Sequence, residues 1–373
     1  MSKILFLVNS PLVVYNFRVE LVERLLAEGH EVVISSPVGD RTEDLRAMGC
    51  DMRDMEMSRH GTNPFKDVKI IKAYKKLIKE VRPDFVLTYT IKPNIYGGMA
   101  CRALNVPYIV NITGLGTAVE NGGFIQKLTC MMYKYALKKV QRVFFQNTEN
   151  MEFFKSKKLA LGKHALLPGS GVNLSRFAAM EYPSDETVEF VYMARIMHEK
   201  GIDQYLDAAK YIRAKYPNTV FHVCGFCEQA YEETLKVLHA DGTIQYHGML
   251  KDTRDILCRT HCTILPSYYP EGLSNTLLES AACARPIITT NRAGCREAID
   301  DGVTGYIVNQ KDSQDLIEKI EKFIALPREE KIAMGLAGRA KVEREFDRNI
   351  IVNAYMEEMG IANEERSSVS STV

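Results

Sequence analysis

Two glutamates in the second half of the chain, Glu271 and Glu279, lie eight positions apart in the segment EGLSNTLLE. Gly272 permits a tight turn, and Ser274 is a favourable N-cap for the helix that the following apolar residues predict. The first amides of such a helix, near Leu273–Asn275, have no acceptor within the helix and carry a partial positive charge. We therefore interpret this turn and helix start as a site that can hold a diphosphate.

The second carboxylate extends this interpretation. Asn275 and Glu279 are four residues apart and share one helix face. The Glu279 carboxylate, one helix turn beyond the first amides, can accept hydrogen bonds from two vicinal hydroxyls, as on a ribose. Glu271 would instead contact a hydroxylated group beyond the phosphates. The spacing alone also allows a simpler alternative, in which both glutamates are solvated residues of a helix and a loop.

Two cations that could serve the same diphosphate lie earlier in the chain. Arg195 ends a predicted strand, Lys200 follows five residues later, and Gly201 begins the next predicted helix. At the Gly272 turn, both cations would offset the negative charge of a bound diphosphate, although two cations at this spacing are a weak signal alone.

These patterns resemble those of a known enzyme family. The pattern E-G-x6-E, preceded by P-S-Y and followed by A-x4-P-I-I-T-T, resembles the donor-site signature of glycosyltransferase family 4. The segment ARIMHEKG, Ala194–Gly201, resembles that family's Arg/Lys diphosphate clamp, and the two segments occur in the family's order. The resemblance covers essentially the whole chain. It implies the GT-B fold, an α/β architecture with two Rossmann-like doubly wound parallel-sheet domains facing a cleft, and a retaining glycosyltransferase activity.

The resemblance also assigns roles to individual residues. Arg195, Lys200 and Glu271 are the expected catalytic residues, with Glu271 orienting the transferred sugar. No metal and no other cofactor is expected, because the two cations and the helix amides take the place of a metal ion. The expected donor-binding residues, which include the loops that would hold the nucleotide base, are Gly114, Gly116, Gly225, Met249, Gly272, Leu273, Ser274, Asn275 and Glu279.

The elements that would position these residues alternate between strands and helices in both halves of the chain, and the predicted helices include Tyr15–Glu28 and Asn94–Leu104. This alternation predicts parallel doubly wound sheets, whose ligands bind at the loops after the strand carboxyl ends. We expect an acceptor-binding domain at 1–171 and a donor-binding domain at 172–345. The resemblance adds a helix within 346–363 that crosses back to the first domain, and the polar residues 364–373 are expected to be disordered.

Loops of the first half supply the acceptor candidates. The loop ending in YNFR has no G-x-G-x-x-G pattern, which argues against a nicotinamide or flavin cofactor on this half. Its Y-x-F-R ending resembles a subgroup of the family and makes Arg18 a candidate contact for an acceptor phosphate. The other acceptor candidates are Arg59, Lys92 and Asn94. Each has an alternative role in local structure or as a solvated charge.

The composition indicates the class of protein and its cellular compartment. The 373 residues are 46% hydrophobic and 25% charged, as in soluble globular proteins. No apolar run approaches the ~20 residues of a membrane span, and the N-terminus predicts a strand instead of a cleavable signal, so a cytoplasmic protein is expected. Nine scattered cysteines favour reduced thiols over a Cys224-x-x-Cys227 redox or zinc site.

Charge is distributed unevenly. Residues 1–175 contain 25 Lys and Arg against 16 Asp and Glu, whereas residues 176–373 contain 23 against 31. The basic first half, with an amphipathic lysine-rich helix within 124–139, suits an anionic membrane surface, although a Met and aromatic stripe is also common in protein cores. We expect peripheral association with the inner face of the plasma membrane and no nucleic-acid partner.

The predicted reaction is transfer of a hexose or N-acetylhexosamine from a UDP-sugar to a lipid-linked or oligosaccharide acceptor in bacterial surface polysaccharide synthesis. The UDP donor and the acceptor rest on the resemblance. Two alternatives stay open. A nucleotide-sugar epimerase or hydrolase of the same fold would need an acid and a base in the cleft, and a non-catalytic partner subunit would be expected to lack one of the four charged residues of the donor site.

Overall fold

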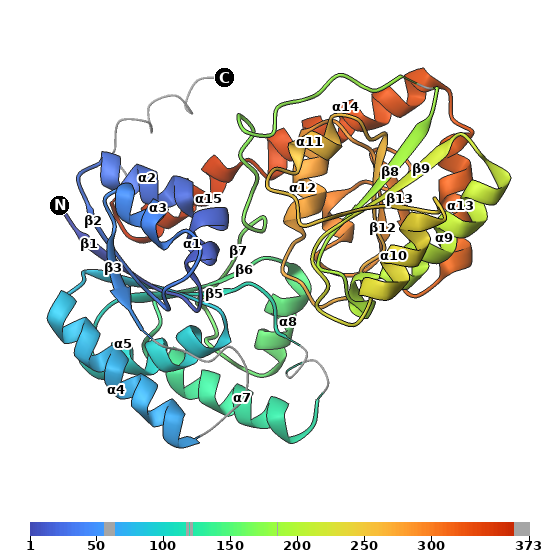
Figure 1. The fold of residues 1–373 in the computed structure, drawn as a ribbon. Helices are drawn as coiled ribbons and strands as arrows, with labels where there is room; N and C mark the ends of the chain where they lie inside the picture. Colours follow the sequence, from blue (N-terminus) through green and yellow to red (C-terminus); the bar gives the residue numbers. More distant parts are fainter. Residues whose placement is uncertain (56–63, 117–118, 120–121, 185, 362–373) are drawn as a thin grey trace. The chain divides into compact units, whose positions relative to one another are not determined.

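The computed structural model describes residues 1–55, 64–116, 119, 122–184 and 186–361. It divides into two compact units, the first formed by Met1–Ser170 and Arg348–Val373 and the second by Gly171–Asp347 (Figure 1). Each unit contains one parallel sheet with helices on both faces. The predicted fold class of two Rossmann-like doubly wound domains is confirmed.

The first unit contains a seven-stranded sheet of order β3-β2-β1-β4-β5-β6-β7, parallel throughout. Its strands are β1 (Lys3–Leu7), β2 (Glu31–Ser36), β3 (Asp51–Asp54), β4 (Phe85–Tyr89), β5 (Tyr108–Ile112), β6 (Arg142–Phe145) and β7 (His164–Leu166). Its helices are α1 (Pro11–Phe17), α2 (Val19–Ala27), α3 (Thr42–Ala47), α4 (Pro64–Val81), the π-helix η1 (Pro93–Gly97), α5 (Gly98–Leu104), α7 (Gly123–Ala136), the 3-10 helix η2 (Leu137–Lys139), α8 (Thr148–Ser156) and α15 (Arg348–Glu358).

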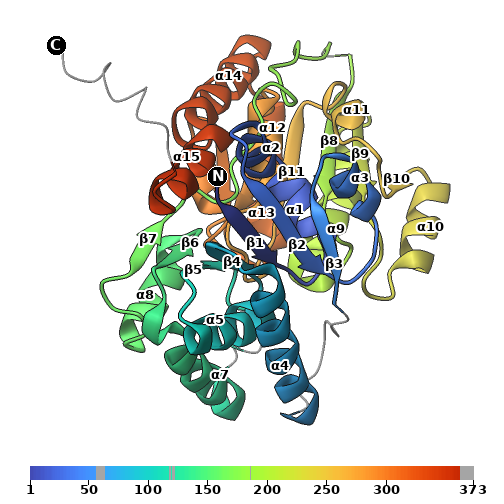
Figure 2. The same ribbon diagram turned by 90° about the vertical axis from the view of Figure 1, so that its left-hand side faces the viewer.

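Two hydrophobic layers hold the helices on the first sheet. One layer joins the sheet to α1, α2, α3 and α15, and the other joins it to α4, α5, α7 and α8 (Figure 2). The last described helix therefore packs on the first unit, beside α2 (Figure 1). None of the described helices has the length and hydropathy to span a membrane.

The second unit contains a six-stranded sheet of order β10-β9-β8-β11-β12-β13, also parallel throughout. Its strands are β8 (Val188–Met193), β9 (Thr219–Cys224), β10 (Gln245–Gly248), β11 (Cys262–Leu265), β12 (Ile287–Thr290) and β13 (Gly305–Val308). Its helices are the 3-10 turn η3 (His198–Lys200), α9 (Ile202–Lys215), α10 (Glu232–Ala240), α11 (Arg254–Leu257), α12 (Asn275–Ala282), the 3-10 turn η4 (Arg296–Ala298), α13 (Ser313–Ile324) and α14 (Arg328–Glu345).

Strand order fixes where each sheet can bind a ligand. In both sheets the first strand is central, and the chain runs outward from it first to one side and then to the other. The order reverses between β1 and β4 in the first unit and between β8 and β11 in the second. Ligands of open parallel sheets bind at the carboxyl edge of such a reversal, because the loops diverge there.

The structure differs from the predicted elements at particular places. The single helix predicted over Tyr15–Glu28 is two helices, α1 and α2, because Arg18 leaves the helical region at φ −142°. The helix predicted over Asn94–Leu104 begins with a π-turn that starts at Pro93. Arg18 is buried against Tyr89 and Tyr355, and Asn94 is hydrogen-bonded to Thr88 and Asn111. A local pattern does not encode such tertiary contacts.

Candidate functional site

The loops after β8 and β11 pack directly on each other at the reversal point of the second sheet. Gly201 has φ +75°, and a side-chain carbon there would lie 2.1 Å from the carbonyl oxygen of Pro266. A carbon on Gly225 would lie 1.8 Å from the carbonyl oxygen of Ala194. Only glycine allows these approaches, so the two glycines bring three strand-end loops together.

Arg195 lies in the first of these loops, with its side chain partly exposed. Its Nη1 donates to Glu228 Oε2 at 2.5 Å, and its guanidinium carbon lies 4.9 Å from the centre of the Tyr269 ring. Burial acts to lower the pKa of Arg195, but Tyr269 and Glu228 outweigh that effect and raise the pKa above its ordinary value. The guanidinium is therefore a permanent cation at the strand end.

Lys200 is buried, with 8% of its surface exposed, and forms an ion pair with Glu271. Its Nζ also lies 5.0 Å from the centre of the Tyr269 ring, so both predicted cations face the same tyrosine. Burial, reinforced by the charge of Arg195, lowers the pKa of Lys200 to about 8. The Glu271 carboxylate opposes that shift by favouring the ammonium form. The structure thus brings Arg195, Lys200 and Glu271 together.

The turn at Gly272 leads into α12 as predicted, with Ser274 at the N-cap. The Ser274 side chain makes no capping hydrogen bond. The backbone amide of Ser274 donates to the carbonyl oxygen of Gly294 at 2.7 Å, so this amide already has an acceptor within the protein. The Leu278 amide donates to Ser274 O at 3.3 Å, which leaves the amides of residues 275–277 without an acceptor inside the helix. The amides that are available to an anion at the start of α12 thus lie slightly later in the chain than the sequence predicts, and their contact with a diphosphate stays a prediction.

Asn275 and Glu279 lie on α12 with partly exposed side chains. The Oδ1 atom of Asn275 is buried and has no hydrogen-bond partner within the described part of the chain. A buried oxygen of this kind is usually satisfied in a working protein, either by water or by a ligand. The hydroxyl-binding role predicted for this helix face stays a prediction, and the unpartnered oxygen is consistent with it.

Gly225 and Met249 lie in the adjacent loops after β9 and β10. The Gly225 amide donates to the carbonyl oxygen of Gly248 at 2.7 Å, which holds the two loops side by side. Met249 is 74% exposed. These loops stand at the same edge of the sheet as the cation pair, and their contact with a base stays a prediction.

Sequence reasoning missed two members of this cluster. Glu228, from the loop after β9, pairs with Arg195, and the fully buried Cys295 lies close enough to influence the pKa of Lys200. Neither is signalled by spacing, because each belongs to a loop brought in by a different strand. The positive-φ Gly294, which packs against Gly272, is the one local signal near Cys295.

The acceptor candidates of the first unit have varied surroundings. Arg18 is buried at 3% exposure, with its guanidinium carbon 5.2 Å and 5.5 Å from the ring centres of Tyr89 and Tyr355. Asn94 is buried and hydrogen-bonded inside the unit, whereas Lys92 is partly exposed. Arg59 lies outside the described residues. Their acceptor contacts stay predictions.

The glycine loop after β5 is shaped by backbone conformation. Gly114 and Gly116 have φ values of +145° and +73°. A side-chain carbon on Gly116 would lie 3.2 Å from the side chain of Ile91, so this loop packs on the loop after β4. The predicted contact of its amides with a diphosphate stays a prediction.

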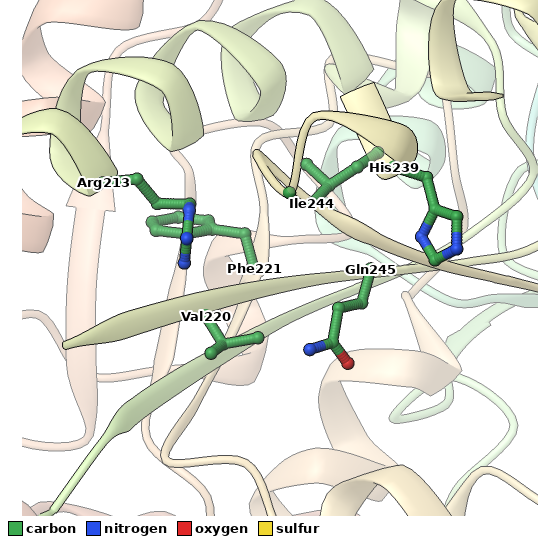
Figure 3. Close-up of a pocket in the computed structure, with 7 residues that line it drawn as sticks. Arg213, Val220, Phe221, His239, Ile244 and Gln245 are labelled. Carbon is green, nitrogen blue, oxygen red and sulfur yellow. The ribbon is translucent and has the colours of Figure 1, made fainter. Parts of the chain in front are cut away.

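A separate hollow of about 400 Å³ lies elsewhere on the second unit (Figure 3). Val220 and Gln245 stand at the amino ends of β9 and β10, opposite the strand-end loops. Arg213 reaches it but donates to the carbonyl oxygen of Thr219. The hollow is therefore separate from the candidate donor site. Its lining residues are Arg213, Val220, Phe221, His239, Gly242, Ile244 and Gln245.

Neither a group of metal-ligating side chains nor a disulfide is found in the part of the chain that the structure describes. No group of three or more His, Cys, Asp or Glu side chains there could hold a metal ion. All nine cysteines are free thiols, including Cys224 and Cys227.

Comparison with known sequences places both halves of the chain. The family model "Glycosyl transferase 4-like" matches residues 3–147, and "Glycosyl transferases group 1" matches residues 180–341. The chain is 28% identical to the N,N'-diacetylbacillosaminyl-diphospho-undecaprenol alpha-1,3-N-acetylgalactosaminyltransferase of Campylobacter jejuni, over 94% of this chain and 96% of that protein. It is 25% identical to the UDP-Gal:alpha-D-GlcNAc-diphosphoundecaprenol alpha-1,3-galactosyltransferase of Escherichia coli, over 68% and 70%.

Solved structures show the same fold. A glycosyltransferase from Rickettsia africae superposes with a TM-score of 0.78 at 20% identity, over 96% of this chain and 97% of that one. HepE of Anabaena, in complex with UDP, superposes with a TM-score of 0.79 at 15% identity, over 96% and 100%. The solved structures show the GT-B fold. The two family models, which match residues 3–147 and 180–341, show that the chain belongs to glycosyltransferase family 4.

Proposed function

We propose that the protein transfers a hexose or N-acetylhexosamine from a UDP-sugar to a lipid-linked acceptor, with the donor bound at the strand ends of β8 and β11. The observation that carries this proposal is the convergence of Arg195, Lys200 and Glu271 beside the start of α12. Two cations and a set of unpaired amides fit a diphosphate, and the carboxylate beside them fits the hydroxyls of its sugar.

The charges suggest how the sugar bond would break. In the reaction, the bond between the anomeric carbon and the diphosphate oxygen breaks, and a bond from that carbon to the acceptor oxygen forms on the same face. Arg195 and Lys200 would stabilise the negative charge that grows on the leaving diphosphate. The diphosphate would itself take the acceptor proton, so that atoms and charge balance without a protein nucleophile.

Independence from metal ions is part of the proposal. A nucleoside diphosphate in water usually needs a divalent cation to offset its charge, and here two side-chain cations stand at the expected position. In the structure each of them faces a carboxylate, Glu228 or Glu271. Donor binding would exchange these partners for phosphate oxygens and free Glu271 to contact the sugar.

The acceptor is proposed to be a sugar on a polyprenyl diphosphate. The names of the Campylobacter and Escherichia relatives specify diphospho-undecaprenol acceptors, and the first of these relatives is similar along almost the whole chain. The first unit would bind the acceptor, since its carboxyl edge at β1 and β4 is the second reversal point of the molecule.

Peripheral contact with the inner face of the membrane through the first unit would deliver such an acceptor. Helix α7 exposes Phe124 at 79% and Met131 at 63%, next to the exposed lysines Lys127, Lys134 and Lys138. Apolar side chains among lysines suit the headgroup region of an anionic bilayer.

The test is a panel of nucleotide sugars incubated with the protein in chelator, with and without bacterial lipid extract, scored by nucleoside diphosphate release and by labelled lipid. Release from one UDP-sugar that rises with lipid is the expected result. Turnover that ignores lipid would point to a hydrolase or epimerase instead. Silence with every donor would contradict the transferase proposal and favour a non-catalytic subunit.

A further inference from the structure

The loop that follows β4 in the first unit carries backbone strain. Thr90 has φ +69°, in the left-handed region that a β-branched residue rarely adopts. Its hydroxyl oxygen is buried with no hydrogen-bond partner in the described ranges, and the π-helix at Pro93–Gly97 begins three residues later. Strained residues and π-turns persist where the surrounding structure holds them, often at ligand sites. This loop stands at the β1 and β4 reversal point.

Buried hydrogen bonds close the base of this loop. The Thr88 hydroxyl donates to Asn94 Oδ1 at 2.8 Å, which joins the strand before the loop to the π-helix after it. The side-chain amide Nδ2 of Asn94 donates to the carbonyl oxygen of Asn111 at 2.8 Å. The side-chain amide Nδ2 of Asn111 donates to the carbonyl oxygen of Thr88 at 3.0 Å. The three side chains are buried at the carboxyl ends of β4 and β5. Together they hold the Thr90–Lys92 segment in one conformation.

One further member of this network comes from the other end of the chain. Tyr355 of α15 is fully buried, and its hydroxyl donates to Asn111 Oδ1. The helix is fixed at both ends, so its tyrosine has a defined position. Two ion pairs at 2.8 Å fix it: Arg348 with Glu20 and Arg142 with Glu358.

We propose that Tyr355 is a positioning residue for acceptor binding, which acts by holding the strained Thr90–Lys92 segment through Asn111 and Asn94. The proposal rests on the proposed function, because it takes the first unit to be the acceptor side. The Thr90 hydroxyl, kept without a protein partner, would donate to a sugar or phosphate oxygen of the acceptor. Without the Tyr355 hydroxyl, Asn111 Oδ1 becomes a buried acceptor with no donor, and the segment relaxes.

The test variant is Tyr355→Phe, which keeps the ring and removes only the hydroxyl. The expected result is a rise in the acceptor KM of about tenfold, with the acceptor-independent release of nucleoside diphosphate unchanged. Thr88→Val should raise the acceptor KM in the same way. The double variant should be little worse than either single one, because both changes break one network.

A matched control separates positioning from general destabilisation. Tyr108, also fully buried in the first unit, donates its hydroxyl to Ala136 O at the opposite, amino end of β5. Tyr108→Phe should lower the melting temperature by a similar amount and leave the acceptor KM unchanged. An equal rise in acceptor KM for both variants would overturn the proposal.

A measurement without substrate keeps the proposal separate from the proposed function. Amide hydrogen exchange in residues 90–97 should become faster in Tyr355→Phe and stay as in the wild type in Tyr108→Phe. Unchanged exchange in Tyr355→Phe overturns the positioning role, whether or not sugar transfer is observed. Absence of transfer by the wild type, by contrast, would overturn the proposed function and the acceptor role with it, and would leave only the structural link between Tyr355 and residues 90–97.

Discussion

At the scale of single residues, the donor site depends on two cations in different environments. Arg195 is partly exposed and permanently charged, whereas Lys200 is buried and pairs with Glu271. Each would stabilise charge that exists mainly in the transition state. We predict that Arg195→Ala and Lys200→Ala each lower kcat by about 10²-fold or more, with smaller changes in KM. Steady-state kinetics with Lys210→Ala, an exposed lysine on α9, as control would check this.

The buried lysine also predicts a pH dependence. Because burial lowers the pKa of Lys200 to about 8, its ammonium form is lost as the pH rises through that value. The kcat/KM for the donor, which reports ionisations of the free enzyme, should therefore decline above about pH 8. Lys200→Arg should remove the decline, since arginine stays charged, and Glu271→Gln should move it to lower pH by removing the stabilising carboxylate. Identical alkaline limbs in all three proteins would contradict the assignment.

At the scale of elements, Gly201 sets how closely the loops after β8 and β11 approach. A side-chain carbon at this position would collide with Pro266 O at 2.1 Å, and φ is +75°. Gly242 offers a matched control, with φ +80° and no atom within 4 Å of the added carbon. Gly242→Ala should cost about 1 kcal/mol of unfolding free energy for its backbone conformation alone. Gly201→Ala should cost about 1–3 kcal/mol more. Equal losses in urea unfolding would show that the loops do not pack this way.

A histidine pair across three strands of the second sheet predicts a pH dependence of stability. His222 Nδ1 lies 2.9 Å from His247 Nε2, and His222 Nε2 lies 2.7 Å from Glu189. Burial, and then His222, lowers the pKa of His247 below its ordinary value. Near pH 6 the unfolded chain therefore binds more protons than the folded chain. The stability that neutral His247 allows is present above about pH 6.5 and is lost as the pH falls. The melting temperature should fall less between pH 7 and pH 5 in His247→Gln than in the wild type. An equal fall in both proteins would contradict the role of His247.

At the scale of the whole molecule, the sequence predicted the features that repeat locally. Apolar runs marked the strands, and the turn at Gly272 and the cap at Ser274 marked the start of α12, because turn and cap chemistry is local. The pairing of Glu228 with Arg195, and of Tyr355 with Asn111, joins residues far apart in the chain and has no local signature. The π-turn at Pro93 and the break at Arg18 likewise arise from packing.

The central claim is that the second unit holds a diphosphate with two side-chain cations and no metal. Its most direct test is the calorimetric affinity for UDP and for UMP in the presence of chelator. We predict that the wild type binds UDP at least about tenfold more tightly than UMP, because only UDP presents the second phosphate to Arg195 and Lys200. Arg195→Ala and Lys200→Ala should each reduce that difference. Equal affinity for UDP and UMP, or a preference for UDP that appears only with added metal, would contradict the account.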